Sequence, residues 1–127
     1  MKIHHTAITV LSLEKSIEFY KEVFGLEVVS TFLKENWSAK AVMMSDGFGN
    51  MLELWQFEDS SSLPESQNNF SAQGIKHIAF ETDDAEMMWN KLKEKYECTN
   101  ITIAKISTYF FIKDPTGITL EIYQTNK

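Results

Sequence analysis

The chain has 127 residues, of which 43% are hydrophobic and 13% aromatic, and its formal net charge is −6 at pH 7. A chain of this length and composition can bury one core, and it lacks the features of a disordered chain. All 12 basic residues are lysines, so the chain has neither the basic face nor the guanidinium groups that a nucleic-acid partner requires.

Membrane insertion and disulfide formation are also disfavoured by the sequence. No apolar run approaches the ~20 residues that a membrane-spanning helix needs. Cys98 is the only cysteine, so an internal disulfide is impossible. We therefore expect a cytoplasmic protein with no nucleic-acid or membrane partner.

The first part of the chain predicts one helix among several strands. Residues 3–11 alternate between apolar and polar positions, as a half-buried strand does. A helix is expected over about 13–24, because Ser12 can cap its start and Gly25 can stop it. Further strands are expected at about 26–34, 39–45 and 50–57.

The second part of the chain repeats this order after a polar segment. Residues 58–74 are rich in Ser, Asn and Gln and predict a linker loop. A strand at 75–82, a helix at 83–96 and strands at about 100–106, 108–113 and 118–124 are expected to follow. The sequence thus predicts a single α+β domain over 1–127, built from two tandem βαβββ modules at about 1–57 and 75–127. The modules are expected to form a curved mixed sheet around a cup.

A short phrase near the end of each module supports the repeat. DGFGNMLELWQ at 46–56 returns as DPTGITLEIYQ at 114–124, with five of the 11 positions identical. Each copy places a glutamate, Glu53 or Glu121, on the strand face opposite its Leu and Ile residues. Each module also offers a histidine at its first strand, His5 or His77, and the neighbouring His4 is assigned no role.

These four residues predict a shared metal site. A carboxylate among aromatic side chains is costly unless its charge is compensated. In a chain without arginine, a divalent cation is the suitable partner, and two imidazoles are suitable companions. A lone histidine or glutamate on a strand is more often structural, so the hypothesis depends on the joint recurrence of His5, Glu53, His77 and Glu121.

Strand parity also predicts which side chains line the cup. They are mostly aromatic and suit an apolar or aromatic small molecule, with core packing as the alternative role for part of the set. The set comprises Met51, Trp55, Phe57, Tyr109, Phe111 and Tyr123.

At this point the sequence resembles a known family. The paired modules, the phrase SLEKSIEFYKEVFGLEVV after the first strand and DPTG before the last are similar to the vicinal-oxygen-chelate superfamily. That superfamily includes glyoxalase I, bleomycin- and fosfomycin-resistance proteins, methylmalonyl-CoA epimerase and extradiol dioxygenases. The resemblance implies metal ligands at His5, Glu53, His77 and Glu121, a set similar to that of bacterial glyoxalase I (lactoylglutathione lyase).

The resemblance implies an enzyme that transfers a proton on a small hydroxycarbonyl or thiol-hemithioacetal substrate. Glu121 is then the favoured catalytic base, with Glu53 as the alternative. The implied metal is Ni²⁺, Co²⁺ or Mn²⁺, and Zn²⁺ stays an option. Thr9 stands where glyoxalase I has an arginine for the glutathione carboxylate, so Thr9 is carried over as substrate-binding and the thiol cosubstrate stays open.

Other members of the superfamily supply the alternatives. The first is a non-catalytic protein that binds a drug or metabolite. A ring-cleaving dioxygenase typically uses two histidines and one glutamate, and an epimerase usually has glutamine at the position of Glu53. We expect a homodimer, because bare modules leave sheet edges that a second copy can cover, with the site formed within one chain or across the dimer.

Overall fold

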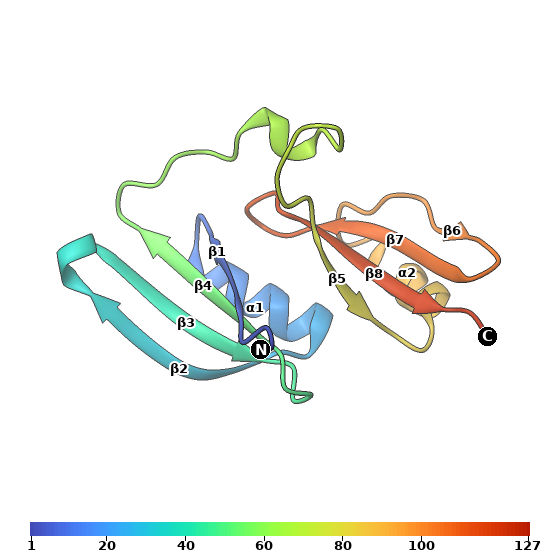
Figure 1. Cartoon of the computed structure of the whole chain (residues 1–127), viewed down its shortest axis with the longest axis horizontal. Coiled ribbons are helices and arrows are strands. Elements are labelled where there is room, and N and C mark those ends of the chain that lie inside the picture. Colours follow the sequence, from blue (N-terminus) through green and yellow to red (C-terminus); the bar gives the residue numbers. More distant parts are fainter. The chain divides into compact units, whose positions relative to one another are not determined.

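The computed structural model describes all 127 residues and divides into two compact units, Met1–Ser62 and Leu63–Lys127. Each unit contains a four-stranded mixed sheet and one α-helix (Figure 1). The predicted α+β fold of two tandem βαβββ modules is confirmed. That the two modules make one domain stays a prediction.

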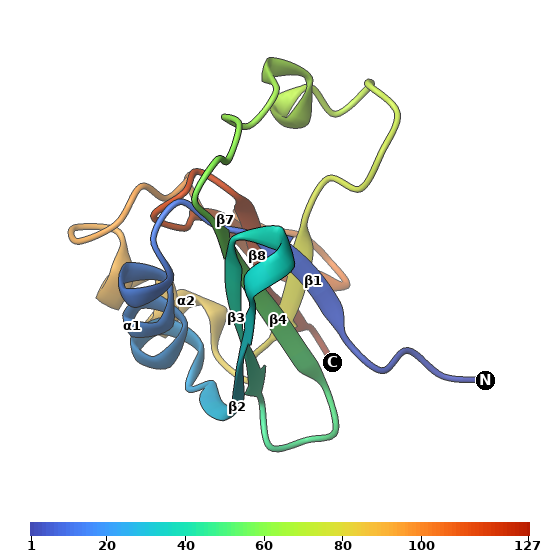
Figure 2. The same ribbon diagram turned by 90° about the vertical axis from the view of Figure 1, so that its left-hand side faces the viewer.

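The first unit begins with a short strand and the longer of the two α-helices. Its sheet has the order β1-β4-β3-β2, with β1 parallel to β4 and the other neighbours antiparallel. Helix α1 packs on one face of this sheet, against β4 (Figure 2). The bounds are β1 Thr6–Thr9, α1 Leu13–Phe24, β2 Glu27–Lys34, the 3₁₀ turn η1 Glu35–Trp37, β3 Ala39–Ser45 and β4 Met51–Phe57.

Helix α1 has the capping residues that its sequence predicted. The hydroxyl of Ser12 accepts a hydrogen bond from the Lys15 N–H at 3.3 Å. Gly25 ends the helix with a φ of 68°, in the left-handed region that glycine adopts without a steric penalty. One side of α1, which carries Phe19 and Tyr20, is buried together with inward residues of the sheet, namely Val42, Met44, Leu52 and Leu54.

The second unit has the same order of elements in a shorter form. Its sheet runs β5-β8-β7-β6, again with one parallel pair, β5 with β8. The bounds are the 3₁₀ turn η2 Glu65–Asn68, β5 Ile78–Glu81, α2 Ala85–Leu92, β6 Thr102–Ile103, β7 Ser107–Lys113 and β8 Thr119–Thr125.

Three predicted elements of the second unit are shorter than expected. The strand predicted over 75–82 is Ile78–Glu81, the helix predicted over 83–96 ends at Leu92, and the strand predicted over 100–106 is reduced to Thr102–Ile103. For the helix the reason is tertiary, because the Glu97 carbonyl already accepts from the Lys113 N–H at 3.1 Å. The chain must therefore leave the helix early to reach β7.

The repeated phrase has a structural role at both of its ends. Its final glutamine caps the helix of its own unit: Gln56 Oε1 accepts from the Leu13 N–H at 2.6 Å, and Gln124 Oε1 accepts from the Ala85 N–H at 2.8 Å. These amides stand at the first helical positions, where no backbone acceptor is available. The glutamine therefore recurs because each helix start needs an acceptor from the last strand.

The first residue of the phrase organises the turn before the last strand. Asp46 Oδ1 accepts from the N–H groups of Phe48 and Asn50 at 2.7 and 3.1 Å. Asp114 Oδ1 accepts from those of Thr116 and Ile118 at 2.9 and 2.8 Å. The carboxylates thus satisfy equivalent backbone donors in the two turns.

The Asp46 turn also perturbs its carboxyl group. Burial alone raises the pKa of Asp46, but hydrogen bonds from the Asn50 side chain and from the Phe48 and Asn50 backbone outweigh it. The pKa of Asp46 is therefore held below its ordinary value.

Neither α-helix combines the length and the apolar character that are needed to cross a bilayer.

Candidate active site

In the first unit the parallel pairing of β1 with β4 brings a histidine and a glutamate together. Ala7 stands opposite Glu53 in the register, and His5 precedes Ala7 by two residues, on the same side of the strand. His5 Nε2 lies 3.9 Å from Glu53 Oε2. The Glu53 side chain is 13% exposed and that of His5 is 37% exposed, so the carboxylate is the better shielded partner.

Two further contacts hold this pair. The Trp55 indole N–H donates a hydrogen bond to Glu53 Oε1, which leaves Oε2 on the side of His5. His4 Nδ1 lies 2.9 Å from His5 Nδ1, so one of these rings donates to the other. Glu53 is thus oriented by an indole that stands two residues away on the same strand face.

The second unit assembles the equivalent pair more tightly. Ala79 stands opposite Glu121 in the parallel register of β5 and β8. His77 Nε2 lies 2.9 Å from Glu121 Oε2, and the two side chains are 22% and 12% exposed. The His77 ring contacts two phenyl rings, with centroids 5.2 Å from Phe111 and 5.9 Å from Phe70.

The donor chemistry of both pairs fits a divalent cation. Each pair offers one imidazole nitrogen and one carboxylate oxygen, which are common ligands of Zn²⁺, Ni²⁺, Co²⁺ and Mn²⁺. The buried Nδ1 of His77 has no hydrogen-bond partner, so the polar contact of this ring is made by Nε2 toward Glu121. Neither unit by itself gathers three or more His, Cys, Asp or Glu side chains that could hold a metal ion.

The predicted lining residues lie on the same strand faces as the two glutamates. In the first unit, Trp55 stacks on Phe57 with ring centroids 5.7 Å apart, while Met51 begins β4 and Thr9 is exposed opposite Trp55. In the second unit, Tyr109 stacks on Tyr123 at 6.5 Å.

Phe111 pairs with Glu121 in the register of β7 and β8, beside Tyr109. With the exception of Thr9, which is exposed, all of these lining residues are partly exposed, as binding residues need to be.

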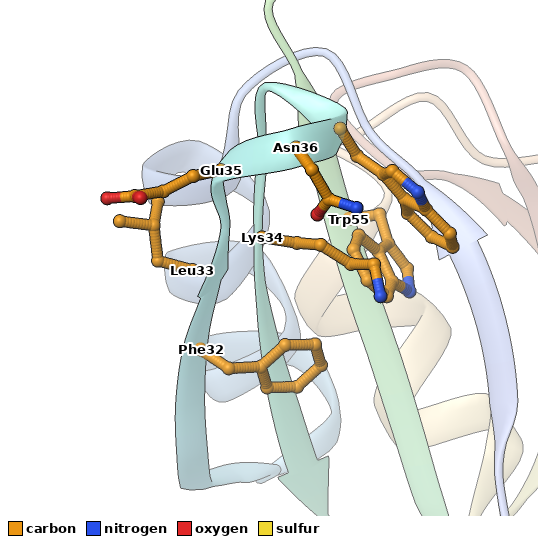
Figure 3. Close-up of a pocket in the computed structure, with 7 residues that line it drawn as sticks. Phe32, Leu33, Lys34, Glu35, Asn36 and Trp55 are labelled. Atoms are coloured by element: carbon orange, nitrogen blue, oxygen red, sulfur yellow. The ribbon is translucent and has the colours of Figure 1, made fainter.

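An open cleft of about 800 Å³ lies beside Trp55 in the first unit (Figure 3). The phenyl ring of Phe32 meets Trp55 edge-on at 5.3 Å, and the Trp37 ring lies 5.6 Å from Trp55. Its lining residues are Phe32, Leu33, Lys34, Glu35, Asn36, Trp37 and Trp55.

Sequence reasoning identified Trp55 but missed Phe32 and Trp37, and it also missed Phe70 beside His77. All three lie outside the repeated phrase, so a comparison of the two modules could not identify them. The usable signal was local: Phe32 pairs with the small residue Ala41, and Ala41 pairs in turn with Trp55. A small residue with a large aromatic residue opposite it on each neighbouring strand predicts a cleft on that face of the sheet.

Comparison with known proteins identifies the family of the chain. Residues 2–122 match the model of the Glyoxalase/Bleomycin resistance protein/Dioxygenase superfamily. The chain is 34% identical over 128 residues to the protein YwkD of Bacillus subtilis, covering 96% of this chain and 95% of that one. A solved glyoxalase family protein from Enterococcus faecalis is 23% identical, with a TM-score of 0.81 and 96% of each chain covered.

One relative with an assigned activity is considerably longer. Glyoxalase I of Saccharomyces cerevisiae is 27% identical over 140 residues, which cover 95% of this chain but only 42% of the yeast protein. The family itself is established by the match over nearly the whole sequence. The chain belongs to the Glyoxalase/Bleomycin resistance protein/Dioxygenase superfamily.

Proposed function

We propose that the protein is a metal-dependent lyase or isomerase of the glyoxalase I type, acting on a small hydroxycarbonyl or thiol-hemithioacetal substrate. The observation that supports this most directly is the repeated histidine–glutamate pair, with His5 3.9 Å from Glu53 and His77 2.9 Å from Glu121. The similarity to the yeast glyoxalase I adds to it, although that protein is more than twice as long.

His5, Glu53, His77 and Glu121 would hold the divalent metal, which is Ni²⁺, Co²⁺ or Mn²⁺, with Zn²⁺ as the fourth option. The metal would supply the Lewis acidity that stabilises negative charge on substrate oxygen. The imidazoles bind as neutral rings, so metal affinity falls when acid protonates them.

Glu121 acts as the base in this proposal. It takes a proton from one substrate carbon and returns it to the neighbouring carbon, so the substrate is isomerised and the carboxylate is restored. Glu53 suits this role less well because Trp55 already donates a hydrogen bond to its Oε1. The polar contact of Glu121 in this unit is with His77, which leaves its other oxygen without such a donor.

Metal loading tests the proposal. Chelator-treated protein, loaded in turn with Ni²⁺, Co²⁺, Mn²⁺ and Zn²⁺, is assayed with hemithioacetals of methylglyoxal. Glutathione and other thiols are both used, because the cosubstrate is not assigned, and α-hydroxycarbonyls complete the panel. We expect turnover with at least one metal, abolished by the chelator. A protein that binds metal but is inert toward the whole panel would count decisively against the lyase.

The cleft beside Trp55 favours a second candidate, a protein that binds a drug or metabolite without turnover. Its exposed indole and phenyl rings are a surface on which a planar molecule can rest. Tight ligand binding that survives the chelator, together with no turnover, separates this candidate from the lyase.

Two further proposals concern the protein in its cell. A homodimer is supported by the edge strand β2, where Val29 and Leu33 are 57% and 68% exposed. Light scattering at micromolar concentration tests it, and a monomer would refute it.

A cytoplasmic location is supported by the single free cysteine, and cell fractionation tests it.

A further inference from the structure

In the cleft of the first unit, two large aromatic rings flank a small residue. Ala41 in β3 pairs with Phe32 on one side and with Trp55 on the other, and the two rings meet above it at 5.3 Å. Ala41 is 1% exposed, so the rings cover it completely. The hollow therefore has an aromatic floor rather than an open backbone.

The outward faces of these rings are available to a ligand. Phe32 is 38% exposed and Trp37 is 52% exposed, so adjacent side chains present a shared aromatic surface to solvent. The rings of Trp37 and Trp55 are already in contact at 5.6 Å, so no third ring fits between them. A planar ligand would rest on their outer faces.

One lysine lies beside the aromatic rings of the cleft. Lys34 Nζ lies 4.2 Å above the Trp37 ring, and it forms no ion pair with a carboxylate of the chain. Figure 3 shows the Lys34 side chain running toward Trp55, while the side chains of Leu33 and Glu35 point away on the other side of the strand. On the side of the aromatic rings the cleft thus presents the positive charge of Lys34, while the carboxylate of Glu35, which also lines the cleft, is directed away from them.

We propose that this cleft recognises a planar aromatic carboxylate, with the ring resting on Trp37 and Trp55 and the carboxylate meeting Lys34. Under the proposed lyase function, on which this part rests, the substrate is a hydroxycarbonyl compound that carries such an aromatic acid group. The Trp55 indole links the cleft to Glu53 through its hydrogen bond, so a ring held on Trp55 brings the rest of the molecule to the strand face of Glu53.

Calorimetric titration of the full chain with 2-naphthoate tests the cleft without any metal or turnover. The neutral analogue 2-naphthylmethanol and the non-aromatic anion cyclohexanecarboxylate separate the two contributions. We expect 2-naphthoate to bind most tightly. Trp37→Ala should weaken it by about 3- to 10-fold, the range of one lost aromatic contact. Lys34→Met should weaken 2-naphthoate by about 2- to 5-fold and leave 2-naphthylmethanol unchanged.

Matched variants serve as controls. Phe48→Ala removes a ring that is 90% exposed in the same unit but outside the cleft, and Lys40→Met removes an exposed lysine of β3. Both should leave binding unchanged. Trp37 is the preferred substitution because it is more exposed than Trp55, so the variant keeps the packing of the sheet.

Two results would overturn the proposal: no binding of 2-naphthoate at millimolar concentration, or binding that Trp37→Ala or Lys34→Met leaves unchanged. The failures of the two proposals are distinguishable. If 2-naphthoate binds and the two substitutions weaken it, but the metal-loaded protein is inert, the lyase proposal fails and the cleft proposal stands. If the protein turns over methylglyoxal adducts but does not bind 2-naphthoate, the cleft proposal fails and the lyase proposal stands.

Discussion

The two units have the same backbone plan and differ in the side chains placed upon it. Each pairs its first strand with its last, and each places an alanine opposite the glutamate, at Ala7–Glu53 and Ala79–Glu121. Around Glu53 the neighbours are an indole donor and an imidazole at 3.9 Å. Around Glu121 they are an imidazole at 2.9 Å and the ring of Phe111.

The aromatic surfaces differ for an equally local reason. In the first unit the centre of the ladder is Ala41, and the neighbouring rings overhang it. In the second unit the equivalent position is Tyr109, which stacks on Tyr123 and is paired with Thr102. A repeated backbone can therefore serve two purposes when one position changes from small to large. The four predictions below test how far the two units have diverged.

The largest difference is expected between the two glutamates. Glu121→Gln keeps an oxygen donor but loses the base, so turnover by metal-loaded protein should fall by about 10²- to 10⁴-fold. Glu53→Gln should cost less if the glutamates have specialised. Steady-state kinetics on a confirmed substrate measures both variants, with the exposed Glu86→Gln of helix α2 as the control. Parent-like turnover by fully loaded Glu121→Gln would remove Glu121 as the base.

Substitution of each histidine should show how much each unit contributes to metal affinity. His5→Ala and His77→Ala should each weaken metal binding by at least about 100-fold, since removing a group that merely supports a ligand already costs 10- to 100-fold. The loss should be greater for His77, whose contact with its glutamate is shorter and less exposed.

Competition with a chromophoric chelator measures these affinities. Asp59→Ala, which removes an exposed potential ligand of the first unit outside the pair, is the control, and circular dichroism checks that each variant is folded. Unaltered affinity in both alanine variants would exclude these histidines as ligands.

The helix-capping glutamines should contribute similar amounts to stability. Gln56→Ala and Gln124→Ala each leave the first amide of a helix without its acceptor, at a cost of about 1 kcal/mol in the free energy of unfolding. The larger loss is expected for Gln124, because α2 has eight residues and α1 has 12. Urea denaturation measures both, with the exposed Gln73→Ala as reference. Midpoints equal to that reference would show that water replaces the glutamine at no cost.

The smallest effect concerns the turn aspartates. Because the folded-state pKa of Asp46 is lowered, its contribution is present above the unfolded pKa and is lost as pH falls through the folded value. Asp46→Asn should therefore reduce stability by a few tenths of a kcal/mol at neutral pH, as is usual for an exposed polar contact. The difference from the parent protein should close below about pH 4. Thermal melts from pH 3 to pH 7 measure it, and a difference that widens toward low pH would contradict this sign.

Sequence periodicity predicted the types of the elements because strand and helix repeats are local properties. The repeat predicted the modules, and strand parity placed Glu53 and Glu121 opposite the core faces, where burial confirms Leu52 and Leu120. The early end of α2 was not predictable in this way, because it depends on a backbone hydrogen bond from the Lys113 N–H to the Glu97 carbonyl. Element ends are decided by such distant partners.

The candidate site was partly predictable for the same reason. The repeat pointed to two histidines and two glutamates, whose roles as metal ligands stay predictions. It could not point to Trp37 or Phe70, which have no counterpart in the other module and touch the site only through tertiary packing. Nor could residue type reveal that Trp55 donates to Glu53, because that contact depends on the rotamers of both side chains.

The parallel pairing of first and last strands determines when each half-site can form during folding. The β-hairpins β3–β4 and β7–β8 close locally, but His5 meets Glu53, and His77 meets Glu121, only after the chain has returned from the far end of its unit. Contacts between distant positions are slow to form, because a long loop must close first. We therefore expect each histidine–glutamate contact to form late in the assembly of its unit. A nascent chain that lacks its last strand can form the first contacts of a unit but cannot present its ligand pair.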